Sequence, residues 1–380
     1  DVVGAIKRGL EQDVLADLVL HLAATGDAVE AKVSRPVHRR DTFQKVEIYL
    51  PKVLHVDATG ARDLDYETDL LAAIDWRGYD PAPVVGRIPE NPLEAAAQLQ
   101  RITLAQSGED LITGEAVAAS PEALTFDPSY AVRVISDLVP NPFVGRQIVA
   151  ALVDGLKARG FPESRIGRHA GLIIEELRKE LDAERNRRAE AIFRGRVAAH
   201  QIQFRLRLDG DNWRMPHRMD TTLPERARQL AGNDGAPVRK SLFAPFYEDD
   251  LNGEEQNVAV MLDAEATIAW WHRNVAMPSA GYGLQGWKRG RIYPDFIFAV
   301  GGQGAGRRIV ALETKGDHLQ NSDTDYKRAV LNFLANSFDW DTAIPAGQLQ
   351  LQKTGETVEC ALILMQDINS QLLGFIASKP

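Results

Sequence analysis

Two short apolar segments that carry charged residues constrain this chain more than any other feature. Residues 293–297 read Tyr-Pro-Asp-Phe-Ile, so that Asp295 lies among strand-forming side chains, and residues 311–316 read Ala-Leu-Glu-Thr-Lys-Gly. Because side chains alternate along a strand, Glu313 and Lys315 are expected on the same face. Charges inside apolar strands are costly unless they are paired or bind a cation. The two segments therefore predict either paired charges or a cation site.

The residue types in these segments favour a particular chemistry. Two carboxylates that converge beside a lysine offer the hard oxygen ligands that Mg²⁺ prefers. Such an ion lowers the pKa of a bound water and neutralises charge on a phosphodiester, while an ammonium group positions that water or stabilises developing negative charge. The alternative is a strand-end turn and a surface ion pair. Since a second E-x-K occurs at Glu30-Ala31-Lys32 without a Pro-Asp strand before it, only the context supports the later copy.

The composition excludes several classes of protein. Among 380 residues, 44% are hydrophobic and 26% are charged, which is ordinary globular usage. The net charge of −9 excludes a globally basic nucleic-acid coat, although a local basic segment remains compatible with it. Because Cys360 is the single cysteine, the chain has neither an internal disulfide nor a cysteine-based zinc site. No apolar run approaches the roughly 20 residues of a membrane span, so we expect a cytoplasmic protein without membrane contact.

Hydrophobic spacing and turn residues predict three regions. Residues 1–125 form an accessory α+β region, residues 126–236 a mostly helical linker or DNA-contact region, and residues 237–380 a mixed α/β domain with a central sheet. In the first two regions we expect helices at 1–25, 143–159 and 170–193, strands at 42–56 (split by Pro51) and 201–208, an extended connection at 81–92, and a linker at 231–237. In the third we expect helices at 253–263 and 326–338, and strands at 268–271, 281–287, 292–300, 309–314 and 358–366.

With Pro294-Asp295 and Glu313-Thr314-Lys315 as the two halves of its motif, the third region resembles the PD-(D/E)XK nuclease superfamily. The order of its expected elements is also that of the superfamily core. The resemblance implies a restriction-endonuclease-like domain, with a central mixed sheet flanked by helices. It implies that Asp295, Glu313 and the Thr314 carbonyl hold Mg²⁺, with Mn²⁺ as an alternative, and that Lys315 orients the attacking water. Glu255 from the first helix would complete the site, although Glu254 or Glu265 would serve as well.

The sequence segments around these motifs resemble one particular group within the superfamily. Glu255, Leu262-Asp263, the Trp270–Asn274 segment, Tyr293–Phe296 and Glu313–Leu319 together look like the C-terminal endonuclease region of type III restriction enzyme Res subunits. This implies cleavage of double-stranded DNA within an ATP-driven phage-defence protein that needs a modification or specificity subunit. Since no G-x-x-x-x-G-K-[ST] phosphate loop is present, ATP would act only through a helicase motor upstream, which we expect to have been cut away.

Several polar residues are candidate DNA contacts. Lys288, Arg289 and Arg291 flank the Pro-Asp strand, His272 and Arg273 follow the tryptophan pair, and Tyr326 and Lys327 open the helix after the E-x-K strand. Arg187 and Arg188 lie in a segment at 185–218 that has nine arginines against three acidic residues. The alternative for the arginine segment is a solvated helix face with the i,i+4 pairs Glu184–Arg188 and Glu190–Arg194. Trp270 and Trp271 are expected in the core.

Two other functions remain open at this level. One is a catalytically silent DNA-binding or scaffolding module that uses the arginine segment. The intact Asp295, Glu313 and Lys315 argue against it, because a silent site would be expected to lose at least one of them. The other is a nuclease that processes DNA ends or junctions, and the sequence does not separate it from a restriction endonuclease.

Overall fold

The protein is described by a computed structural model and belongs to the mixed α/β class, with several small, mostly antiparallel sheets. The described residues are 32–44, 48–90, 125–205, 212–224, 226–276, 281–301, 308–315, 322–337, 349–351, 356–364, 372–374 and 376. The chain packs into two units. Unit 1 contains the residues up to Lys52, Phe204–Leu284 and the residues from Ile292 on; unit 2 contains Val53–Gln203 and Gln285–Arg291. The expected helix at 1–25 lies outside the described residues.

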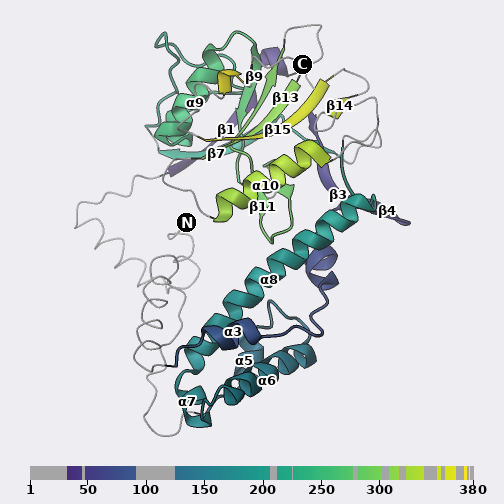
Figure 1. The fold of residues 1–380 in the computed structure, drawn as a ribbon. Coiled ribbons are helices and arrows are strands. Elements are labelled where there is room, and N and C mark those ends of the chain that lie inside the picture. The colour runs from purple at the N-terminus through teal and green to yellow at the C-terminus, as the bar shows by residue number, and fades with distance from the viewer. Residues whose placement is uncertain are drawn as a thin grey trace, which may run out of the picture. The chain divides into compact units, whose positions relative to one another are not determined.

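The main sheet of unit 1 has five strands in the order β14-β15-β13-β12-β9 (Figure 1). Its ladders are antiparallel except for β13 with β15, which run parallel. The expected strands at 268–271, 309–314 and 358–366 are confirmed, whereas the one at 292–300 is interrupted at residues 293–295. The bounds are β9 Ile268–Arg273, β12 Phe296–Val300, β13 Arg308–Lys315, β14 Leu349–Leu351 and β15 Glu356–Leu364.

Two helices pack on this sheet, close to the expected ranges. Helix α9 (Gly253–Ala264) places Val258 and Leu262 in one core with Trp271 of β9. Helix α10 (Ser322–Ser337) packs along β15, and its Lys327 contacts Glu313 of β13. Trp270 and Trp271 are 1% and 0% exposed, which confirms that both belong to the core.

A second, three-stranded sheet in the order β7-β1-β8 joins the edge of β9. The amide of Leu242, just before β8, donates to the Trp271 carbonyl at 2.6 Å, and the Trp271 amide donates to the Lys240 carbonyl at 2.9 Å. The remaining elements of this region are β1 Lys32–Arg39, η1 Asp41–Phe43, β2 Tyr49–Leu50, β6 Trp213–Arg214, β7 Arg218–Pro224, β8 Phe243–Ala244, η4 Glu248–Asp250, β10 Leu284–Gln285 and β11 Arg291–Ile292. The expected strand at 42–56 is split at Pro51, as predicted, but its first residues, Thr42 and Phe43, belong to the 3-10 helix η1 and not to a strand.

The segment at 231–237, expected to be a linker, is a closed turn inside unit 1, so that prediction is wrong. The Gly232 amide donates to the Ala236 carbonyl at 2.8 Å, and the Val238 amide donates to the Leu230 carbonyl at 3.1 Å. Gly235 has a φ of 75°, a conformation that glycine adopts readily. The Gly, Asn and Asp residues of this segment therefore mark a tight turn that returns the chain to the core.

Unit 2 is mostly helical, with a small sheet in the order β4-β3-β5. The expected helices at 143–159 and 170–193 are confirmed as α6 and α8, and α8 continues to Ala198. Asn141 caps α6, since its side-chain oxygen accepts the Phe143 amide at 3.0 Å. The bounds are β3 Lys52–Asp57, β4 Gly60–Asp63, η2 Tyr66–Leu70, η3 Leu71–Ala73, α3 Ala82–Arg87, α5 Pro128–Val134, α6 Pro142–Ala158, α7 Glu163–Arg168, α8 Ala170–Ala198 and β5 Ile202–Arg205.

The proline-rich segment at 81–92 is not simply an extended connection, because it contains helix α3. Pro81 lies at the N-terminal end of this helix, where a proline removes no needed hydrogen bond. Val84 and Val85 are buried, and a Cβ at Gly155 of α6 would lie 2.8 Å from the Val85 side chain. Helix α3 is thus a packed element of the unit 2 core, stabilised by close approach to α6.

Candidate functional site

Asp295 directly precedes β12 and is fixed by the neighbouring strand. Its Oδ2 accepts hydrogen bonds from the Thr314 amide and from Thr314 Oγ1, each at 2.7 Å. Phe296 pairs with Leu312 at the end of the β12–β13 ladder, so Asp295 lies one residue beyond the paired part of β12, next to the segment that carries Glu313 and Thr314. The Asp295 carbonyl accepts the Asn274 amide at 2.9 Å, which ties it to the end of β9 as well. Asp295 is therefore held just before β12, against the residue that follows Glu313 on β13.

Glu313 is 2% exposed, and α10 supplies a cation to it. Lys327 Nζ lies 2.8 Å from Glu313 Oε1 and 3.8 Å from Asp323 Oδ2. Burial lowers the pKa of Lys327. The ion pair and hydrogen bond with Glu313, followed by the charges of Asp323 and Asp295, raise it by more, so the pKa of Lys327 lies above its ordinary value. A positive charge is thus held among the carboxylates.

The remaining predicted catalytic residue, Lys315, is the last residue of β13. Its side chain lies outside the described residues, so its role stays a prediction. Thr314, the predicted carbonyl ligand, has a buried side chain (9% exposed) that binds Asp295. The Thr314 hydroxyl thus has a structural task, orienting Asp295, that the sequence motif does not reveal.

Glu255 has two clear partners, and neither is Asp295 or Glu313. It occupies the third position of α9 in a capping box: its amide donates to Asn252 Oδ1 at 2.9 Å, and its Oε2 accepts the Asn252 amide at 3.0 Å. Its Oε1 lies 2.7 Å from Arg273 Nη2. Asn-Gly-Glu-Glu at 252–255 is a recognisable capping signal, so this function could have been found in the sequence.

The sheet register separates Glu255 from the two carboxylates. Arg273, its partner, pairs with Phe296, which pairs with Leu312, so that Arg273 shares a face with Leu312 and Glu313 is directed to the opposite face. No group of three or more His, Cys, Asp or Glu side chains suited to a metal occurs within the described residues. Metal ligation by Glu255 therefore stays a prediction, as it does for its alternatives. Of these, Glu254 lies in the first turn of α9, and Glu265 Oε1 accepts the Thr267 amide.

The other candidate DNA contacts outside α8 belong partly to unit 1 and partly to unit 2. His272 and Tyr326 are 5% and 8% exposed. Burial, followed by the charges of Arg273 and Arg39, lowers the pKa of His272 to about 3 and keeps its ring neutral at pH 7. Three basic residues belong to the unit 2 segment: Arg289 pairs with Glu67 at 2.6 Å, Arg291 lies 3.8 Å from Asp63, and the Lys288 carbonyl accepts a hydrogen bond from Gln285.

The arginines of α8 are paired along their own helix. Arg188 Nε lies 2.6 Å from Glu184 Oε1 and Arg194 Nη2 lies 2.8 Å from Glu190 Oε1, which confirms both expected i,i+4 pairs. Arg187 is 66% exposed and contacts Glu180 and Glu184, at 3.1 and 2.8 Å. The Arg188 guanidinium also lies 5.2 Å from the centre of the Trp76 ring. DNA contact by Arg187 and Arg188 stays a prediction, and it would compete with these carboxylates.

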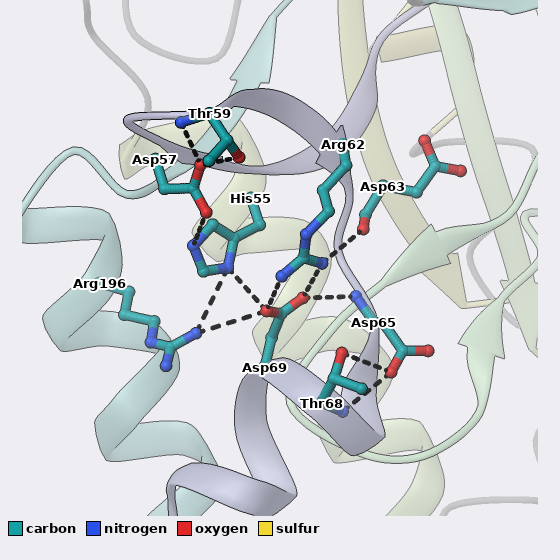
Figure 2. Close-up of polar contacts among 9 residues, drawn as sticks. All are labelled: His55, Asp57, Thr59, Arg62, Asp63, Asp65, Thr68, Asp69 and Arg196. Carbon is teal, nitrogen blue, oxygen red and sulfur yellow. Dashed lines mark hydrogen bonds and ion pairs between the residues drawn. The ribbon is translucent and has the colours of Figure 1, made fainter.

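Unit 2 holds a charged cluster around Asp69 that the sequence did not indicate (Figure 2). Asp69 is 2% exposed, and the guanidinium of Arg62 donates hydrogen bonds to both of its carboxylate oxygens, at 2.6 and 2.7 Å. His55 Nδ1 lies 2.8 Å from Oδ1, the Asp65 amide donates to Oδ2 at 2.9 Å, and Arg196 lies 3.8 Å away. Burial raises the pKa of Asp69, but the bonds from Arg62 and Asp65 and the nearby charges lower it overall. This carboxylate joins β3, β4, η2 and α8.

Comparison with protein-family models, with curated proteins and with solved structures yields no match for this chain. Within the part of the chain that the structure describes, no helix combines the length and apolar character that crossing a bilayer requires. The functional argument therefore depends on the geometry around Asp295 and Glu313.

Proposed function

We propose that unit 1 is a metal-dependent DNA endonuclease of the PD-(D/E)XK type that hydrolyses phosphodiester bonds. The observation that carries the proposal is that Asp295 is bound to Thr314, the residue after Glu313, while the half-buried ammonium of Lys327 contacts Glu313 itself. The order α9, β9, β12, β13, α10, β15 supports it, because the two motif halves fall on neighbouring antiparallel strands between two helices. Charged groups gathered at a partly buried location, as Asp295, Glu313 and Lys327 are, are common in functional sites.

The residues present fit a divalent cation. Asp295, Glu313 and the Thr314 carbonyl would hold it, since all three offer hard oxygen ligands. The ammonium of Lys327, beside Glu313 and within the electrostatic reach of Asp295, indicates that this location favours positive charge. When bound, the ion would neutralise charge on the scissile phosphate and lower the pKa of the attacking water.

The side chains of this chain would do the rest. Thr314 holds Asp295 in one orientation through two hydrogen bonds, so that the carboxylate needs little rearrangement to bind a ligand. Lys315 would orient the attacking water and stabilise the negative charge that develops on the phosphate. Lys327 would keep Glu313 ionised and correctly placed. The proposed phosphate contacts are Lys288, Arg289, Arg291 and the α8 arginines. To bind DNA, the arginines would have to exchange their present carboxylate partners for phosphate groups.

In the larger setting, we propose that the chain is the C-terminal part of a type III restriction-like phage-defence protein of the cytoplasm. An upstream helicase motor would use ATP, and a modification or specificity subunit would select the DNA sequence. The support for this setting is the sequence resemblance around residues 240–340, and the double-stranded DNA substrate follows from the same resemblance.

A cleavage assay tests the proposal. Wild-type protein is incubated with supercoiled and linear duplex DNA in Mg²⁺, Mn²⁺ or EDTA, beside Lys315→Ala and a control variant, Lys157→Ala. Lys157 is a surface lysine that pairs with Glu163, so its loss should leave activity unchanged. We expect metal-dependent nicking or cutting that falls about a hundredfold or more in Lys315→Ala, the scale of losing one group that stabilises transition-state charge.

The supercoiled and linear substrates also separate the proposed function from its alternatives. Cutting confined to the ends of linear DNA would replace restriction by end processing. A third outcome is that wild type and Lys315→Ala bind DNA equally and that even a full-length protein supplied with ATP does not cut. This outcome would reject the nuclease in favour of a silent module.

A further inference from the structure

Unit 1 contains a cavity of about 280 Å³ that the proposed cleavage chemistry does not use. It lies where the β7-β1-β8 sheet meets the end of β9, and its apolar walls include Phe243, Pro245 and Phe246. Small-molecule pockets begin at about this volume and are mostly apolar, with a few placed polar groups. Rings and a proline give the cavity flat surfaces, which suit a flat ligand.

One buried polar side chain faces this cavity without a partner. His272 lines the cavity, is 5% exposed, and packs its ring against Phe243 with centres 5.1 Å apart. None of the described residues forms a hydrogen bond with its ring nitrogens. Because the ring is neutral at pH 7, it offers one donor and one acceptor side by side with an aromatic wall. Its ring nitrogens are not among the fully enclosed, unpartnered atoms of the described residues, so a molecule in the cavity can reach them.

Asp250 supplies the second polar group. Its Oδ1 accepts the Thr221 hydroxyl at 2.5 Å, which fixes the carboxylate at the cavity wall. Asp220 contributes a further carboxylate, whereas Arg273 Nη2 is already bound by Glu255. The cavity thus offers hydrogen-bond acceptors and little spare positive charge, so it disfavours phosphate and favours a ligand with an amino group.

The cavity also borders the proposed cleavage site. Arg273 and Val275 line it, and Asn274 between them donates its amide to the Asp295 carbonyl at 2.9 Å. A group bound in the cavity would therefore stand next to the strand end that carries the first carboxylate.

We propose that this cavity binds a single unstacked nucleobase that carries an exocyclic amino group beside a ring acceptor, namely adenine or cytosine. The amino group donates to Asp250 and the ring nitrogen accepts from His272, while the base lies against Phe243 and Phe246; enzymes that extrude bases combine the same kinds of contact. Thymine presents a carbonyl where the amino group would be, directly against the carboxylate. The choice of a base over other flat heterocycles rests on the proposed function, which supplies DNA as the partner.

The test measures base binding without cleavage. The full chain is titrated in EDTA with a short single-stranded oligothymidine that carries one central dA, dC or dT. We expect about tenfold tighter binding for the central dA or dC, the scale of one good base-edge contact. Because metal is absent, a failure here rejects the base pocket and leaves the nuclease proposal untouched, and the reverse also holds.

A matched pair of variants locates the effect. Asp250→Ala should abolish the preference for dA and dC, whereas Asp249→Ala, the same change at the exposed neighbouring residue of η4, should keep it. The ring resonances of His272 in the wild-type protein should shift on addition of deoxyadenosine or deoxycytidine but not thymidine, a readout that does not depend on the folding of a variant. Equal affinity for the three oligonucleotides, or a preference that survives Asp250→Ala, would overturn the proposal.

Discussion

Two buried carboxylates, one in each unit, show two different ways of holding a charge inside this protein. Asp69 and Glu313 are both 2% exposed. Asp69 is bound by the planar guanidinium of Arg62, by a backbone amide and by a histidine ring. These contacts, with that of Arg196, join β3, β4, η2 and α8. Glu313 instead is contacted by a lysine on α10, and a second carboxylate, Asp295, is bound to the residue that follows it. The first arrangement uses rigid donors, and the second brings like charges together.

The difference separates a structural charge from a functional one. An arginine fork and a backbone amide satisfy a carboxylate completely and give it no reason to exchange partners. Two adjacent carboxylates are mutually repulsive unless a cation lies between them. We therefore interpret the Asp69 cluster as a device that joins β3, β4, η2 and α8, and the Asp295–Glu313 pair as a cation site.

The largest effect is expected from removing the structural charge. Asp69→Ala should lower the free energy of unfolding by about 2–4 kcal/mol, because the buried parts of Arg62 and His55 would lose the carboxylate that binds them. Asp57→Ala is the control, since Asp57 belongs to the rim of the same cluster but is 44% exposed, and it should lower the free energy of unfolding clearly less than Asp69→Ala does. Urea unfolding measures both. Equal losses would mean that Asp69 is not the anchor of the cluster.

A smaller loss should follow removal of the cation beside Glu313. Lys327→Gln should cost about 1–3 kcal/mol in EDTA, because the buried carboxylate loses its charged donor. Lys179→Gln should cost under about 0.5 kcal/mol, since this 65% exposed lysine lies 3.8 Å from a glutamate that Arg87 also binds. Mn²⁺ should restore part of the loss in Lys327→Gln by supplying the missing positive charge. A loss that Mn²⁺ leaves unchanged would count against the cation site.

The pH dependence sharpens the same contrast. The pKa of Asp69 is lowered in the folded protein, so its stabilisation is present above the ordinary aspartate pKa of about 4 and is lost as the pH falls through the lower folded value. Wild type should therefore lose unfolding free energy more steeply than Asp69→Asn below pH 4. Denaturant titrations at a series of pH values measure this slope. Parallel curves would show that Asp69 does not contribute through its charge.

The smallest effect is expected on α8. Arg187→Ala should change the free energy of unfolding by less than about 0.5 kcal/mol, because Arg187 is an exposed member of surface ion pairs. A salt titration of DNA affinity adds a second readout: loss of one phosphate contact would reduce the slope of log K against log salt by about 0.9. An unchanged slope would remove Arg187 from the proposed contacts.

Much of unit 1 could be predicted because its signals are local. Apolar runs predicted β9, β13, β15 and most of β12 but not β14, and the helical spacing predicted α9 and α10. The motif halves at Asp295 and Glu313 were expected to converge, and the structure binds Asp295 to Thr314, the residue after Glu313. Likewise the i,i+4 pairs of α8 follow directly from sequence spacing.

The rest could not be predicted because it depends on packing between distant segments. The contact between Lys327 and Glu313 requires α10 to return over the sheet, and the Asp69 cluster joins residues as far apart as His55 and Arg196. Helix α3 was missed because its prolines dominate the local signal, although close packing at Gly155 supports it. The division into three regions was based on hydrophobic spacing and turn residues along the chain, whereas unit 1 combines three separate segments of the chain and unit 2 combines two.

Metal binding by the carboxylate pair tests the central claim most directly. Wild type, Asp295→Asn, Glu313→Gln and, as a control, Asp69→Asn are titrated with Mn²⁺, and the bound ion is followed by electron paramagnetic resonance. We expect one Mn²⁺ site per chain, with affinity reduced at least about tenfold in Asp295→Asn and in Glu313→Gln, since each removes a charged ligand, and with affinity unchanged in folded Asp69→Asn. Wild-type affinity in both Asp295→Asn and Glu313→Gln would contradict the claim that these two carboxylates form a cation site.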